Sequence, residues 1–83
     1  MSVTSSEAKT GDDDREAILR RRLAVNVRRH RCAQQRTVEN AAEGAALNWR
    51  HWQKIERSEV NVTLKTLVRL AASLGVLPGQ LLT

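Results

Sequence analysis

The sequence predicts an all-α protein, folded as one compact bundle of five helices. Residues that favour helices (Ala, Leu, Arg, Gln and Glu) recur along the chain, whereas Tyr and Phe are absent and proline occurs once. The aromatic signature of β-rich proteins is therefore missing. Apolar residues repeat at intervals of three and four, which is the spacing of one helix face. With 83 residues, the chain is long enough for one domain with a small core.

The first predicted helix is long and begins near residue 12. Residues 1–11 are small, polar and unpatterned, so they predict a flexible tail ahead of a domain over residues 12–83. The acidic triplet Asp12–Asp14 is expected to cap the free N–H groups at the helix start. The helix is expected to end near Gln34. Its core-facing stripe consists of Ile18, Leu19, Leu23 and Val27.

Two short helices follow, joined by only a few residues. Thr37 is the expected N-cap of a helix over residues 38–43, and Gly44 is expected to end that helix in a left-handed conformation. Asn48 is the expected N-cap of the next helix, over about residues 49–57. This spacing around a glycine is typical of a helix-turn-helix.

Start and stop signals also mark the last two helices. Thr63 is the expected N-cap of a fourth helix, which Gly75 ends. Pro78 suits the first position of a short final helix. The apolar residues of the fourth helix, at helical spacing, are Leu64, Leu67, Val68, Leu70, Ala71 and Leu74.

The charge is unevenly distributed along the chain. Of the formal net charge of +5, residues 1–14 carry −3, so residues 15–83 carry +8. A folded body this basic favours a polyanionic partner, and nucleic acid is the commonest such partner. The alternative is a basic face that contacts only solvent.

Several classes of protein are excluded by what the sequence lacks. Cys32 is the only cysteine, so no internal disulfide and no cysteine-based zinc site is expected. The absence of a long apolar run and of a signal-like N-terminus predicts a cytoplasmic, nucleoid-associated protein of bacterial type with no membrane partner. No paired carboxylates, activated nucleophile or Gly-rich phosphate loop occurs, so we expect no enzyme, cofactor or metal.

Two segments carry the pattern of a known family. Residues 55–67 (IERSEVNVTLKTL) and residues 70–76 (LAASLGV), together with a weaker match at residues 23–31, resemble the lambda-repressor-like (Cro and Xre type) helix-turn-helix family. The resemblance covers about residues 23–82. It implies a transcriptional regulator, with repression as the expected outcome, whose recognition helix at about residues 49–57 enters the major groove of double-stranded DNA.

Four positions depart from the family pattern. Val38 stands where the family usually has a phosphate-binding Gln, and Gln35 stands where it usually has Gly. Arg36 and Ala41 replace leucines that are usually in the core. Because Trp52 is larger than the usual Ile or Leu, we expect it to pack over Ala41 and to fill the space that the alanine leaves.

The resemblance also implies which side chains meet DNA. The base-contact positions of the family fall on Trp49, Arg50 and Lys54. Arg reads guanine through O6 and N7, and Lys contacts guanine or a phosphate. Trp49 could press on a thymine methyl, stack elsewhere or fold back onto the protein. The expected contacts to the sugar-phosphate backbone are Thr37, Asn48, His51, Gln53, Arg57 and Asn61. A plain N-cap role is the alternative for Thr37 and Asn48.

The family pattern also suggests how the recognition helix is held. An Arg of the first helix usually meets the Glu that follows the recognition helix, which here implies a buried ion pair between Arg31 and Glu56. The alternative is two exposed charges of little energetic value.

The sequence also indicates how the protein assembles and which partners it binds. One subunit covers one DNA half-site, so a homodimer is expected. The C-terminal surface Val76–Leu82 is favoured as the interface over the lengthened first helix, because its apolar residues exceed what a short helix needs for its own core. The alternative is that these residues simply close the bundle. The alternative function is a protein-interaction module, antitoxin-like or a co-regulator, with weak or no specific DNA binding. Val38 favours this alternative, whereas Arg50, Lys54 and Arg57 argue against it.

Overall fold

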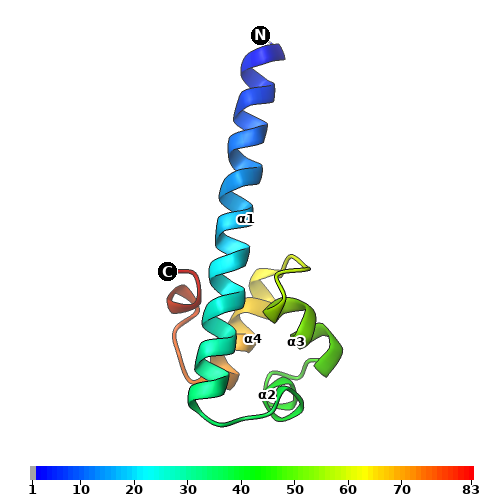
Figure 1. The fold of residues 1–83 in the computed structure, drawn as a ribbon, viewed down its shortest axis with the longest axis vertical. Helices are drawn as coiled ribbons and strands as arrows, with labels where there is room; N and C mark the ends of the chain where they lie inside the picture. Colours follow the sequence, from blue (N-terminus) through cyan, green and yellow to red (C-terminus); the bar gives the residue numbers. More distant parts are fainter. Residues whose placement is uncertain (1) are drawn as a thin grey trace.

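The computed structural model describes the backbone of residues 2–83 and the side chains of residues 11–83 (Figure 1). It contains four α-helices and one 3₁₀ turn within those residues: α1 (Ser2–Ala33), α2 (Val38–Gly44), α3 (Trp49–Glu56), α4 (Leu64–Leu74) and η1 (Pro78–Leu81). The all-α prediction is confirmed. The prediction of a fifth α-helix was wrong, because the last element is a single 3₁₀ turn.

The buried side chain of Asn26 attaches this last element to α1. Its amide group donates to the carbonyl oxygens of Leu81 and Thr83, each at 3.0 Å. Leu81 is fully buried in the core. These two hydrogen bonds fix the C-terminal segment against α1 and satisfy two carbonyls that have no partner in the short turn.

The start of α1 also differs from the expectation. The helix begins at Ser2, so Asp12–Asp14 lie inside it and do not cap its N-terminus. Interior N–H groups already bond to carbonyls one turn earlier and need no cap. The side chains of residues 1–10 lie outside the described part, so the flexible tail over residues 1–11 and the domain boundary at residue 12 stay predictions.

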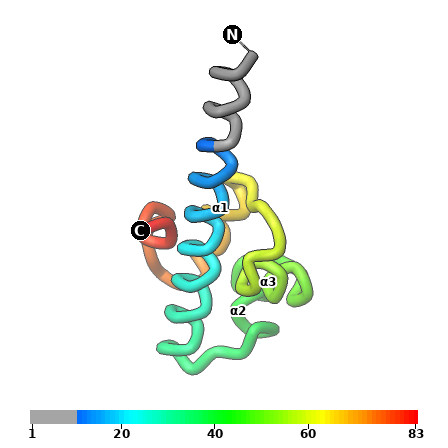
Figure 2. Tube along the Cα trace, turned by 45° about the horizontal axis from the view of Figure 1, so that its top comes forward, coloured from blue at the N-terminus to red at the C-terminus, as the bar shows by residue number. Residues whose placement is uncertain are grey.

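The helices gather around the second half of α1. Figures 1 and 2 both show α2 and α3 on one side of α1 and η1 on the other. Leu23 and Val27 are the α1 residues of the predicted stripe that are buried, whereas Ile18 and Leu19 are exposed. The predicted core-facing stripe therefore began more than one turn too early. Among the described residues, no other helix packs against α1 at Ile18 and Leu19, so these two side chains stay exposed. None of the described helices has the length and apolar character needed to cross a membrane.

The end of α1 turns through a residue that replaces a glycine of the family pattern. Gln35 has a φ of +55°, and the Arg36 N–H donates to the Arg31 carbonyl at 3.2 Å. This pairing across the helix end requires a left-handed residue, which is usually glycine because glycine has no Cβ to clash. The chain therefore makes this turn with a residue that carries a side chain, and it accepts strain at Gln35.

Replacing Gln35 by glycine should stabilise the protein. The glutamine side chain is exposed and takes part in none of the hydrogen bonds between the described residues, and glycine relieves the left-handed strain. We expect the Gln35→Gly variant to gain about 0.5–1 kcal/mol in the free energy of unfolding, measured by urea denaturation. The matched control Arg28→Gly, at an exposed site within the helix, should lose about 1 kcal/mol. A loss in both variants would contradict the strain argument.

The turn between α2 and α3 forms by other means than predicted. Thr37 caps α2, as expected, by accepting from the Asn40 N–H at 3.0 Å. Gly44 was expected to be left-handed but stays in α2, and Ala46 takes the positive φ of +56°. Gly44 serves close packing instead, because a Cβ there would lie 2.9 Å from the Ser73 Oγ. Because Gly44 has no side chain, α2 can lie close to α4 at this point.

Arg36 occupies the position of a core leucine without entering the core. Its guanidinium group donates to the Asn40 Oδ1 at 2.7 Å and to the carbonyl oxygen of Ser73 near the end of α4. The Ser73 hydroxyl in turn donates to the Ala41 carbonyl at 2.7 Å. A cation near a helix C-terminus is favourable, since the last carbonyls carry partial negative charge. Arg36 therefore links α2 to α4 by hydrogen bonds.

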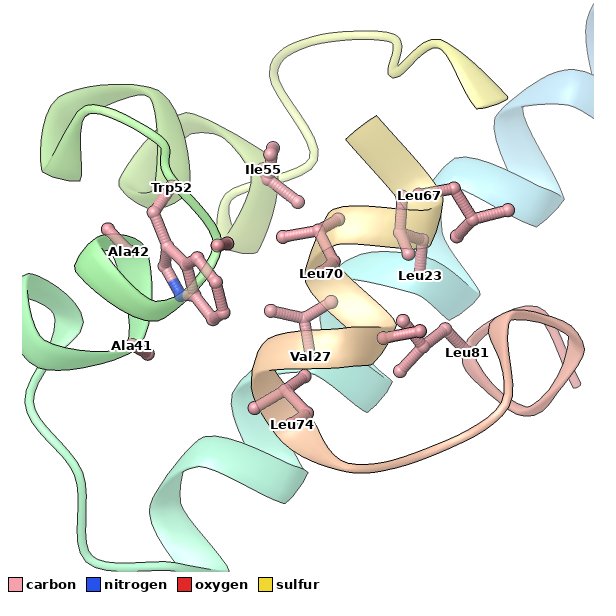
Figure 3. Packing of buried hydrophobic residues seen from close by; sticks show 12 residues of the cluster. Leu23, Val27, Ala41, Ala42, Trp52, Ile55, Leu67, Leu70, Leu74 and Leu81 are labelled. Atoms are coloured by element: carbon pink, nitrogen blue, oxygen red, sulfur yellow. The ribbon is translucent and has the colours of Figure 1, made fainter. Parts of the chain in front are cut away.

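Trp52 lies at the centre of the core. It has no exposed surface and packs in one cluster with the fully buried Ala41 and with Ala42 (Figure 3). Val27 and Leu70 lie on the other side of its ring. Trp52 and Ala41 are buried together at the α2–α3 contact, as predicted. That the large Trp52 compensates for the small Ala41 stays a prediction.

Candidate nucleic-acid interface

The helix α3 begins at a cap that the sequence predicted. The Asn48 backbone is extended, and its Oδ1 accepts from the Arg50 N–H at 2.8 Å. This bond satisfies one of the free N–H groups in the first turn. The first helical residue is therefore Trp49, and the cap fixes the direction in which the first turn presents its side chains.

The two faces of α3 differ in chemistry. Trp52 and Ile55, three residues apart, are buried in the core. Arg50 and Lys54, four residues apart, are exposed, and Trp49 is 38% exposed. One helix thus presents a basic surface to solvent while its opposite side is fixed in the core. We call Trp49, Arg50 and Lys54 the α3 face.

Within the α3 face, two side chains contact each other. The Arg50 guanidinium carbon lies 5.0 Å from the centre of the Trp49 ring. A cation over an indole ring is attracted by the electron-rich ring face, with about 0.5–1 kcal/mol at an exposed site. Trp49 therefore does not fold back into the core but provides a flat surface beside Arg50.

The end of α3 is attached to α1 through a charged group. The Glu56 carboxylate accepts from the Arg31 Nε at 2.7 Å and from its Nη2 at 3.0 Å. The Trp52 Nε1 donates to the same carboxylate at 2.6 Å. Arg31 also donates to the Arg36 carbonyl at 2.9 Å. Its hydrogen bond with Glu56 raises the pKa of Arg31 above the ordinary value, so the guanidinium stays charged.

This network defines where the α3 face sits. A two-pronged Arg–carboxylate contact fixes both distance and orientation. Its side chains are largely buried, with 15% of Arg31 and 9% of Glu56 exposed. Because Trp52 donates to the same carboxylate, the core and the ion pair hold α3 as one unit.

The other predicted DNA contacts lie in varied surroundings. Thr37 and Asn48 are both engaged as N-caps. His51 and Gln53 are half-buried, and Arg57 is exposed directly after α3. Asn61 is exposed but accepts from the Arg20 guanidinium at 2.9 Å. The structure thus brings Trp49, Arg50 and Lys54 to one face and ties Asn61 to α1.

Two features of the site were not foreseen from the sequence. The hydrogen bond from Trp52 to Glu56 joins residues four apart on one helix, and this spacing could have revealed it. The Arg36 contacts to Ser73 join segments that are 37 residues apart. Only the departure of Arg36 from an apolar family position signalled that this residue has an unusual role.

Comparisons with known proteins point to a regulator. No family model matches the chain. The control protein C.SmaI of Serratia marcescens is 41% identical over 61 residues, which are 74% of this chain and 73% of that protein. A crystal structure described as the hypothetical transcription factor NHTF from Neisseria superposes with a TM-score of 0.75 at 34% identity, covering 78% of this chain and 75% of that one.

Proposed function

Because the chain belongs to the lambda-repressor-like (Cro and Xre type) helix-turn-helix family of transcriptional regulators, we propose that it binds specific double-stranded DNA sites through α3. The observation that carries this proposal is the exposure of Arg50 and Lys54 on a helix whose other side is fixed by Trp52 and the Arg31–Glu56 pair. A rigid helix with a cationic outer face fits the major groove, which is about 12 Å wide.

The side chains divide into two roles on DNA. Arg50 reads a guanine through two hydrogen bonds, Lys54 contacts a neighbouring guanine or phosphate, and Trp49 lies beside Arg50 against the base edges. Contacts to the sugar-phosphate backbone set the register of the protein on the duplex. We assign these to Thr37, Asn48, His51, Gln53, Arg57 and Asn61.

We further propose that the protein acts in the cytoplasm, at the nucleoid, as a homodimeric repressor and not as an enzyme. Two copies related by a two-fold axis would cover half-sites about 34 Å apart, one turn of the duplex. Occupying a promoter in this way blocks other proteins from the same DNA.

Arg50→Ala tests the proposed function directly. Losing the guanidinium removes a contact of two hydrogen bonds to guanine. The binding free energy for the selected site should therefore weaken by about 1–3 kcal/mol, and the preference for guanine at that position should disappear. The measurement is fluorescence anisotropy on a duplex selected from a random pool and on its single-base variants. Arg69→Ala, an exposed arginine on α4, is the control and should retain the base preference. An unchanged preference in Arg50→Ala would overturn the role of Arg50.

One observation favours a second candidate function. Val38, at the start of α2, is half-buried against the core and offers no donor to a phosphate. A chain that had lost DNA binding could use the same basic face for an acidic protein partner, as an antitoxin-like module or a co-regulator. This alternative predicts no sequence preference in the selection from a random DNA pool.

A further inference from the structure

The exposure of the apolar side chains bears on where a second copy would bind. The sequence favoured the C-terminal surface, but Leu81 is fully buried there, and Val76 and Leu82 pack against the core. The C-terminal apolar residues therefore mainly close the bundle, and Leu77 alone among them is largely exposed. On α1, in contrast, Ile18 is 51% exposed and Val25 is 57% exposed.

These two residues belong to one stripe that faces away from the core. With 100° between successive residues, Ile18 and Val25 lie on the same side of α1, opposite the buried Leu23 and Val27. The outer stripe consists of Asp14, Ile18, Arg22, Val25 and Arg29, and all five side chains are exposed. Spacings of four and three residues are those of a helix-pairing seam.

The charge along α1 is self-complementary. Residues 12–16 carry four acidic side chains and one basic one (Asp12, Asp13, Asp14, Arg15 and Glu16), whereas the charged side chains of residues 20–31 are all basic (Arg20, Arg21, Arg22, Arg28, Arg29 and Arg31). Two copies of α1 side by side in opposite directions place acidic against basic segments at both ends. Two copies in the same direction place like charges together.

We propose that the protein dimerises by antiparallel pairing of the outer stripe of α1 with the same stripe of a second copy. This inference rests on the proposed homodimer and names its interface. It is an isologous contact, in which each residue pair occurs twice. No residue of the outer stripe is among those proposed to contact DNA.

The stripe also suggests a register. In an antiparallel pair, setting Ile18 against the partner's Val25 sets Asp14 against the partner's Arg29. One Arg29 Nη donates to the Asn26 Oδ1 at 2.8 Å, and a guanidinium group has further N–H donors for a carboxylate of the partner. The same register brings Arg22 near the partner's Arg21 at the two-fold axis. That like-charge contact weakens the dimer, so we expect an association that depends on protein concentration.

Val25→Lys tests the interface without DNA. Sedimentation velocity over a range of protein concentrations should show a dimer for the wild type and at least a tenfold weaker association for Val25→Lys. Circular dichroism should be unchanged, because the residue is exposed. The matched control Leu77→Lys, on the C-terminal surface, should dimerise as the wild type does. A monomer in Leu77→Lys with an intact dimer in Val25→Lys would overturn the proposal.

Arg22→Glu tests the direction and the register. A carboxylate at this position would face the partner's Arg21, so the dissociation constant should fall about fivefold at low salt, and the gain should vanish at high salt. A parallel pair would instead place the two new carboxylates together and weaken the dimer. Weaker or unchanged association would overturn the antiparallel register.

DNA binding separates this inference from the proposed function. On a duplex with one half-site, Val25→Lys should bind as the wild type does, whereas on a full site it should lose cooperativity. A wild-type protein that dimerises through α1 but shows no DNA preference would overturn only the proposed function. A wild-type protein that stays monomeric at high concentration would overturn the interface, whatever its affinity for DNA.

Discussion

Replacing Trp52 by alanine is expected to remove about 3–5 kcal/mol from the free energy of unfolding. Trp52 has no exposed surface and packs among Ala41, Val27 and Leu70, so its removal leaves a cavity that small neighbours cannot fill. The change also deprives Glu56 of its hydrogen bond from the indole nitrogen. Urea denaturation followed by circular dichroism measures the loss. Trp49→Ala, at an exposed position of the same helix, is the control and should cost less than about 1 kcal/mol.

A paired substitution tests why this tryptophan is needed. Trp52→Leu alone should destabilise the protein, because leucine leaves unfilled volume beside Ala41. Ala41→Leu alone should also destabilise it by overpacking, at a cost of about 1–3 kcal/mol. The double variant should be more stable than the sum of the two losses predicts, since the volumes then compensate. Additive losses would mean that the two residues do not share one space.

Breaking the ion pair should have the next largest effect. Arg31→Ala leaves the largely buried Glu56 carboxylate without its counter-charge, and we expect a loss of about 3 kcal/mol in the free energy of unfolding. Arg28→Ala, an exposed arginine on the same helix, should change stability by less than about 0.5 kcal/mol. Glu56→Gln preserves the shape of the side chain and should still destabilise the protein, because Arg31 then lacks its anion. If Arg31→Ala left the free energy of unfolding unchanged, the stabilising role of the Arg31–Glu56 ion pair would be contradicted.

The pH dependence of this effect follows from the direction of the Arg31 pKa. The folded-state pKa of Arg31 is raised, so the stabilisation is complete below the ordinary guanidinium pKa and is lost only above the folded-state value. The difference in stability between wild type and Arg31→Ala should therefore not decline between about pH 7 and pH 10. A steady decline of this stability difference between about pH 7 and pH 10 would show that the Arg31 guanidinium is not the group that causes it.

Local signals in the sequence located most helix ends. Thr37, Asn48 and Thr63 were predicted as N-caps, and each side chain accepts from a backbone N–H in the first turn of its helix. Gly75 was predicted to end α4 and has the left-handed φ of +71°. Caps and left-handed turns depend on hydrogen bonds and steric clashes between residues a few positions apart. Sequence alone therefore sufficed for these N-caps and for Gly75, although it did not find the left-handed residue Ala46.

The sequence by itself determined the two short helices of the helix-turn-helix and their N-caps, because periodicity and capping are local properties, whereas the resemblance to a known family pointed to the residues of the α3 face. Only the tertiary structure decided how far the core reaches along α1, since Ile18 is exposed simply because no neighbouring helix extends to it. It also decided that Gly44 serves close packing and that Arg36 reaches Ser73 across 37 positions. Such contacts join segments far apart in the chain, and their distances are set by how whole helices pack.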